Sequence, residues 1–173
     1  MRAGHVAACV ALLAACACSS SGSSPSPATS AVRTGSQGLG AATCGRDQRF
    51  LSEVDTEYAN DTADFNTQVN GATLATARTA VNAYEAALQR WISELQSTAT
   101  SAPFDPVRLG FLQGMRNILA GLRTEYRNGS STTTKGNARV NQGAGQLSVA
   151  YRLLFDVSKR FCPGSFLASQ SPG

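Results

Sequence analysis

Histidine is almost missing from this sequence. The one histidine among the 173 residues is His5, which lies in an N-terminal segment with the pattern of a cleaved signal peptide. We therefore expect a mature chain without imidazole, which excludes Ser-His-Asp and Cys-His catalytic sites, histidine-ligated zinc and histidine-ligated haem. The chain shows no other nucleophile motif, so we expect a protein that is not an enzyme.

Long apolar runs are also scarce. The run from Val6 to Ala15 has ten residues, whereas a helix that crosses a hydrocarbon core needs about twenty. Arg2 gives the segment before this run a positive charge. This order of charge and apolar residues predicts a signal peptide over residues 1–15 and not a permanent membrane span.

The apolar run ends in Leu13-Ala14-Ala15-Cys16, which is an aliphatic residue, two small residues and a cysteine. This tetrapeptide resembles the lipobox of bacterial lipoproteins. The resemblance implies that Cys16 becomes the N-terminus after cleavage and carries a diacylglyceryl thioether, and two or more acyl chains make a stable anchor. We therefore expect localisation at the cell membrane, lipid-anchored on its extracytoplasmic face.

A segment without packing residues follows the cysteine. From Ser19 to Thr43 the chain consists mainly of Ser, Gly, Ala, Thr and Pro, with Arg33 as its one charged residue. Such a composition cannot bury enough apolar surface to offset the entropy of ordering. We therefore predict that residues 16–43 are the lipidated N-terminus and a disordered linker, with a reach of roughly 30 Å.

Strand periodicity is lacking in the rest of the chain, where apolar residues recur every three or four positions. This spacing predicts an all-α domain over residues 44–164, folded as an up-down-up-down four-helix bundle and followed by a tail over 165–173. The four apolar stripes contain Leu51, Val54, Tyr58 and Phe65; Leu74, Val81, Leu88 and Leu95; Phe111, Met115, Ile118 and Leu122; and Val140, Leu147, Tyr151 and Leu154.

Two local signals mark helix ends. Asn70-Gly71 is typical of the end of a first helix. Asp105 followed by Pro106 predicts the start of the third helix, with the aspartate as N-cap and the proline at the first helical position.

Cys44 and Cys162 test this topology. In an up-down-up-down bundle the start of the first helix and the end of the fourth lie at the same end, and the two cysteines flank those positions. Cysteines of an exported domain are expected to pair. We predict a Cys44–Cys162 disulfide, which would stabilise the domain by about 2–4 kcal/mol.

Charge divides the domain unevenly. Residues 44–105 carry four Arg against nine acids, a net charge of −5, and residues from 106 onward carry a net charge of +7. We expect the acidic half to dock on the basic half, with Glu53 beside Arg152 and Asp47 beside Lys159. The alternative is a basic face that binds an anionic envelope component. The expected compartment excludes nucleic acid as a partner.

Polar residues on the apolar stripes form the candidate site. Tyr58, Tyr84, Tyr151 and Asn117 are expected at similar heights near the middle of the bundle. Buried phenols need hydrogen-bond partners, so these residues form either a mutually satisfied polar layer or the floor of a ligand pocket.

Glycines on the expected third helix extend this candidate site. Gly110, Gly114 and Gly121 share a face with Asn117, and each glycine costs about 1 kcal/mol of helix propensity relative to alanine. Close helix packing is one reason for such a stripe, and a shallow groove for an acyl chain is the other. Gly114 is the glycine expected to belong to the pocket.

These observations favour a non-enzymatic envelope lipoprotein whose bundle acts as a binding or structural accessory, with the membrane and an anionic envelope component or envelope protein as partners. The alternative is a carrier that holds an apolar ligand, a lipid or haem, within the bundle, with haem ligated by tyrosine or Met115. We expect no cofactor. We also expect no metal site, because the acids from Glu53 to Asp64 on one helical face spread over about 16 Å, too far to surround one ion.

Overall fold

The computed structural model describes residues 38–127 and 134–169. The expected signal peptide, the lipidation site Cys16 and the linker up to residue 37 lie outside the described residues.

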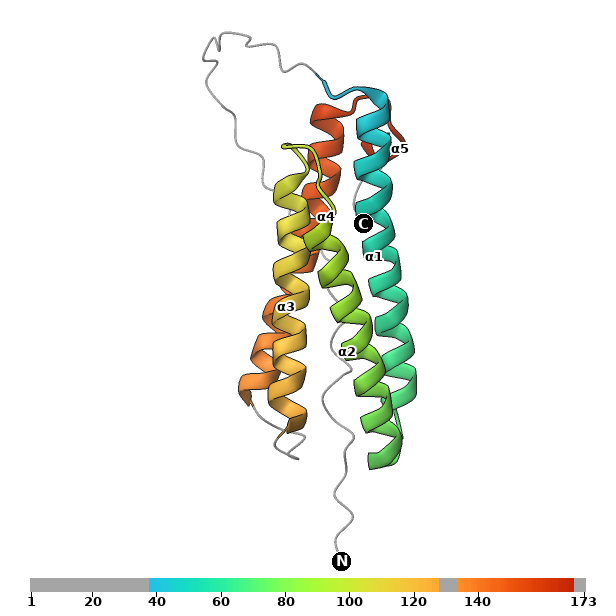
Figure 1. Ribbon diagram of the computed structural model, residues 1–173, viewed down its shortest axis with the longest axis vertical. Helices are drawn as coiled ribbons and strands as arrows, with labels where there is room; N and C mark the ends of the chain where they lie inside the picture. Colours follow the sequence, from blue (N-terminus) through green and yellow to red (C-terminus); the bar gives the residue numbers. More distant parts are fainter. Residues whose placement is uncertain (1–37, 128–133, 170–173) are drawn as a thin grey trace, which may run out of the picture.

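Four long helices make up the domain and run alternately up and down (Figure 1). They are α1 (Ala41–Val69), α2 (Leu74–Ser97), α3 (Asp105–Arg127) and α4 (Thr134–Phe161), and a single turn, α5 (Phe166–Ser169), follows them. The predicted all-α fold with an up-down-up-down order of helices is confirmed.

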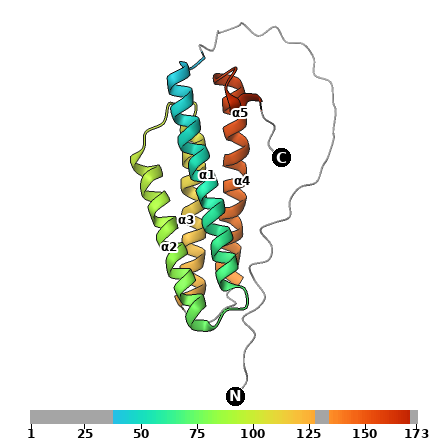
Figure 2. The same cartoon turned by 90° about the vertical axis from the view of Figure 1, so that its right-hand side faces the viewer.

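The core lies along the axis that the four helices share. In Figure 2, α1 lies in front between α2 and α4, and α3 lies behind it. Every helix contributes one face of apolar side chains to this core, as the stripes predict. The largest fully buried apolar side chains are Phe104, Phe111, Phe155, Leu51, Leu88, Leu95, Met115 and Leu154.

The helix ends agree only in part with the local signals. Asn70 is the C-cap of α1, and Gly71 has a positive φ of 71°, a conformation that glycine adopts without strain. The N-cap assignment of Asp105 is wrong, because α3 begins at Asp105 itself and Phe104 accepts the backbone N–H of Arg108. The Asp105 carboxylate instead pairs with the Arg108 guanidinium at 2.6 Å.

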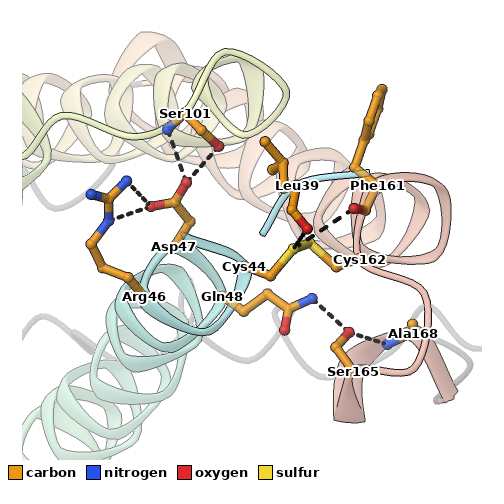
Figure 3. The surroundings of a disulfide bond; sticks show 10 residues. All are labelled: Leu39, Cys44, Arg46, Asp47, Gln48, Ser101, Phe161, Cys162, Ser165 and Ala168. Atoms are coloured by element: carbon orange, nitrogen blue, oxygen red, sulfur yellow. Dashed lines mark hydrogen bonds and ion pairs between the residues drawn. A yellow bond between two sulfur atoms is a disulfide. The ribbon is translucent and has the colours of Figure 1, made fainter. Parts of the chain in front are cut away.

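A disulfide joins the start of α1 to the end of α4 at one end of the bundle, as predicted. Cys44 and Cys162 are bonded with their Cα atoms 5.8 Å apart (Figure 3). Beside them, the backbone N–H of Leu39 donates to the carbonyl oxygen of Phe161 at 2.9 Å. The expected linker boundary at residue 43 is therefore too late, since Cys44 lies inside the first turn of α1.

Asp47 ties α1 to the loop between α2 and α3. Its side chain is 1% exposed and accepts hydrogen bonds from the backbone N–H of Ser101 at 2.9 Å and the Ser101 hydroxyl at 2.6 Å (Figure 3). Arg46 forms an ion pair with the same carboxylate at 2.8 Å. Burial alone would raise the pKa of Asp47, but the hydrogen bonds from Arg46 and Ser101 outweigh it and hold the pKa below its ordinary value.

The expected charge register between α1 and α4 is wrong. Asp47 binds Ser101 and not Lys159, and no ion pair joins Glu53 to Arg152 within the described part of the chain. At this end, the contact of α1 with the C-terminal segment comes instead from Gln48, whose amide donates to the Ser165 hydroxyl at 2.8 Å. Residue 165, expected to begin a tail, thus belongs to the folded unit.

The glycine stripe of α3 faces α4 at close range. A methyl group added at Gly110 would lie 2.9 Å from the Cβ of Ala150, and one at Gly121 would lie 2.7 Å from the carbonyl oxygen of Gly136. Between them, a methyl group at Gly143 of α4 would lie 2.5 Å from the carbonyl oxygen of Gly114. We call this contact of Gly110, Gly114 and Gly121 with α4 the glycine seam.

The glycine seam predicts opposite effects of two matched substitutions on α4. Gly143→Ala should lower the free energy of unfolding by about 1–3 kcal/mol, because its methyl group would meet backbone atoms of α3. Gly145→Ala should raise it by about 1 kcal/mol, since nothing lies within 4 Å of the added carbon and alanine favours the helix. Urea denaturation measures both values, and equal stability of the two variants would contradict the close contact.

Candidate functional site

Two of the predicted tyrosines meet inside the bundle. Tyr84 of α2 is 6% exposed and stacks on Phe65 of α1 with ring centroids 4.6 Å apart. Its hydroxyl lies 2.8 Å from that of Thr62, which also donates to the carbonyl oxygen of Tyr58 at 2.8 Å. The Tyr58 side chain interacts with Tyr84 and Thr62, and this interaction partly offsets the rise that burial gives to the pKa of Tyr58. The hydroxyls of Thr62 and Tyr84 thus satisfy each other between α1 and α2.

Asp55 lies next to this group of hydroxyls on α1. Burial raises the pKa of its carboxyl from 3.8 to about 6. Burial is also the main cause that raises the pKa of Tyr58 and of Tyr151, and the negative charge of Asp55 adds to both increases. The charge of Asp55 therefore acts both on Tyr58 of α1 and on Tyr151 of α4.

Asn117 does not join the tyrosines. Its amide nitrogen donates to Oε1 of Gln146 at 2.8 Å, and its carbonyl oxygen accepts from Nε of Arg139 at 3.5 Å. Both partners belong to α4, so Asn117 lies beside the glycine seam. The expected four-residue layer is wrong in this member.

Gly114 offers no ligand space either. A methyl group added there would lie 2.7 Å from two carbon atoms of Leu147 and 3.0 Å from the carbonyl oxygen of Gly143. The side chain of Leu147 and the backbone of α4 therefore occupy the space that the absent Cβ leaves. Close packing explains the glycines, and the expectation of an acyl groove at Gly114 is wrong.

The basic half of the domain keeps much of its positive charge. Of the ion pairs in residues 38–127 and 134–169, two join the basic half to the acidic half: Arg123 with Glu85 at 3.3 Å, and Arg108 with Asp105 at 2.6 Å. Asp61 of the acidic half instead pairs with Arg90 at 3.4 Å and accepts from the indole N–H of Trp91 at 3.0 Å. The acidic residues of 44–105 therefore pair with fewer of the basic residues from 106 onward than the net charges of the two halves suggested.

A surface groove of about 550 Å³ collects several of the remaining cations. It follows the outer face of α3, with one residue of α2 on one side and one of α4 on the other. Its lining consists of Ile92, Arg116, Leu119, Ala120, Arg123, Thr124 and Arg139. We call it the arginine groove.

The arginine groove combines uncompensated charge with an apolar surface. Arg116 and Arg139 are exposed and have no ion-pair partner in the described chain, whereas Arg123 is paired with Glu85. Among the described residues that line the groove, none is acidic. A site of this kind attracts an anion.

Sequence reasoning missed the arginine groove. Arg116 and Arg123 are seven residues apart, which places them on one face of α3, and this spacing was the available signal. Spacing along one helix could not reveal Arg139, because it belongs to α4 and reaches the groove only through the contact between α3 and α4. Asp55 was missed too, although it follows Val54 and lies three residues before Tyr58.

Residues 38–127 and 134–169 contain no group of three or more His, Cys, Asp or Glu side chains arranged to hold a metal ion. None of the helices described there is long and apolar enough to span a bilayer.

Comparison with known proteins gives no match: no protein-family model, curated protein or solved structure is similar to this chain.

Asp55 predicts a dependence of stability on pH. Because its pKa in the folded state is raised, its ionisation weakens folding, so stability should be highest below about pH 4 on this account and fall as the pH rises to about 6. Asp55→Asn should remove this decline and raise the free energy of unfolding at pH 7 by about 1 kcal/mol, a value reduced for the partial exposure of the side chain. Urea denaturation from pH 4 to 8 measures the effect.

The exposed Asp64→Asn is the matched control, since Asp64 lies on the same helix. An unchanged pH profile in Asp55→Asn would show that Asp55 is not the titrating group.

Proposed function

We propose that this protein is an extracytoplasmic lipoprotein, held on the cell membrane through Cys16, whose helical bundle is a non-enzymatic binding module of the cell envelope. The tetrapeptide Leu13-Ala14-Ala15-Cys16 supports the anchor, as it has the pattern of a lipobox.

The Cys44–Cys162 disulfide is the observation that carries the proposal. Structural disulfides persist in oxidising compartments and are rare in the reducing cytosol. This bond closes a separation of 118 residues at the end of the bundle where the chain enters from the N-terminal segment. It thus fits the export that the signal-peptide pattern predicts.

A binding role suits the chemistry better than catalysis. The chain after residue 15 contains no histidine. The interior hydroxyls of Tyr84 and Thr62 engage each other, which supports a structural role for them and removes the polar floor that an internal carrier would use. The uncompensated arginines of the arginine groove instead offer a surface for an anionic envelope component.

Cys16→Ala tests the anchor. The substitution should abolish labelling by a radioactive or clickable fatty acid and release the protein from the membrane fraction, because the thiol that accepts the lipid is gone. Cys18→Ala, two residues away, is the matched control and should leave both properties unchanged. If Cys16→Ala keeps its label and stays in the membrane fraction, the proposed anchor is wrong.

A further inference from the structure

The arginine groove places two kinds of surface next to each other. Its cationic part consists of Arg116 and Arg139, which come from different helices and have no acidic partner in the described chain. Its apolar part consists of Ile92, Leu119 and Ala120. A ligand that uses the whole groove must therefore carry negative charge and an adjacent apolar portion.

Arg139 is held in place by a neighbouring residue. Its Nε donates to the Asn117 carbonyl oxygen at 3.5 Å, and the Asn117 amide is fixed in turn by Gln146 at 2.8 Å. The remaining guanidinium N–H groups of Arg139 stay available for an oxyanion. Asn117, expected in the core, thus lies beside the groove in contact with Arg139.

Arg123 contributes differently. Its Nε is 3.3 Å from Oε2 of Glu85, so its charge is partly offset. The ion pair fixes Arg123 between α3 and α2. The net positive charge of the groove therefore comes from Arg116 and Arg139, which are the residues to test.

We infer that the arginine groove binds the headgroup of an anionic phospholipid, with the phosphate at Arg116 and Arg139 and the glycerol and first acyl carbons against Ile92, Leu119 and Ala120. This inference rests on the proposed function, because a protein anchored on the membrane surface meets such lipids directly. Guanidinium groups bind phosphate oxygens through paired N–H donors, which makes arginine suited to this ligand.

The apolar floor distinguishes a lipid from a free phosphate. An inorganic phosphate or a sugar phosphate would leave the exposed parts of Ile92, Leu119 and Ala120 in contact with water. A glycerophospholipid covers both parts at once, and the volume of about 550 Å³ lies in the range of small-molecule sites.

The test measures binding of a soluble lipid to the full chain with Cys16→Ala, which has no acyl anchor of its own. The probe is dihexanoyl-phosphatidylglycerol below its critical micelle concentration, titrated by calorimetry or by chemical-shift changes. Dihexanoyl-phosphatidylcholine tests the need for net negative charge, and glycerol 3-phosphate tests the need for the acyl chains.

We expect the phosphatidylglycerol probe to bind at one site, and the phosphatidylcholine probe and glycerol 3-phosphate to bind at least about tenfold more weakly. Glycerol 3-phosphate lacks the apolar part of the contact, and the choline group places a positive charge beside the arginines. The double variant Arg116→Gln/Arg139→Gln should weaken phosphatidylglycerol binding by about tenfold. Arg152→Gln, an exposed arginine on α4 outside the groove, is the matched control and should change binding less than about twofold.

Three results would overturn the inference. If glycerol 3-phosphate bound as tightly as phosphatidylglycerol, the groove would be a site for free anions. If phosphatidylcholine bound as tightly as phosphatidylglycerol, the net charge of the lipid would not determine binding. Equal losses in Arg152→Gln and in the double variant would show attraction by the whole basic face. Thermal unfolding of each variant confirms that the fold is intact.

The outcome is independent of the lipidation test. Groove binding without acyl labelling at Cys16 would remove the proposed anchor and leave the ligand site. Labelling at Cys16 without groove binding would leave the lipoprotein and remove the ligand site.

Discussion

The close approach of α3 and α4 is the constraint on which the rest of this structure depends. Side chains normally keep two helix axes 8–10 Å apart. At the glycine seam, α3 has no side chains between its backbone and α4. The backbone of α4 at Gly143 then lies against that of α3 at Gly114. Each glycine lowers helix propensity, so the tight contact must offset that cost.

The glycine seam also decides where polar residues lie. Because α4 packs directly on α3, Asn117 meets Gln146 and Arg139 across the edge of the contact. Arg139 thereby comes beside Arg116 and Arg123 on the outer face of α3. The arginine groove is thus a consequence of helix packing and not of any local motif.

The other end of the bundle depends on covalent and polar ties. The disulfide between Cys44 and Cys162 removes conformational entropy from the unfolded chain. The buried Asp47 supplies acceptors for the backbone and hydroxyl of Ser101, so the loop before α3 is fixed to α1. In Figure 3 the two ties lie side by side on the first turns of α1.

Sequence periodicity was sufficient for the helices, their order and the disulfide. These features follow from the spacing of apolar residues along one helix and from the positions of the helix ends in the sequence. Both can be read from the sequence without knowing how the helices pack. The positions of Tyr58 and Tyr84 along the bundle axis were also predicted closely enough to expect them near each other. Height follows from the rise per residue, which is nearly constant.

The direction in which each side chain points was harder to predict. Asn117, expected at the height of the tyrosines, faces α4, because the glycines on the same side of α3 pack against that helix. Asp47 likewise reaches a loop residue, Ser101, which no helical register includes. The arginine groove combines three helices and requires their packing to be known.

Hydrogen exchange of backbone amides, followed residue by residue with and without a reductant, tests most directly whether the glycine seam is the stable centre of the domain. Amides of α3 and α4 around Gly114 and Gly143 should exchange most slowly and remain protected after the disulfide is reduced, whereas the first turns of α1 should lose protection. Exchange around Gly114 and Gly143 that is as fast as in the first turns of α1, before reduction, would contradict this centre.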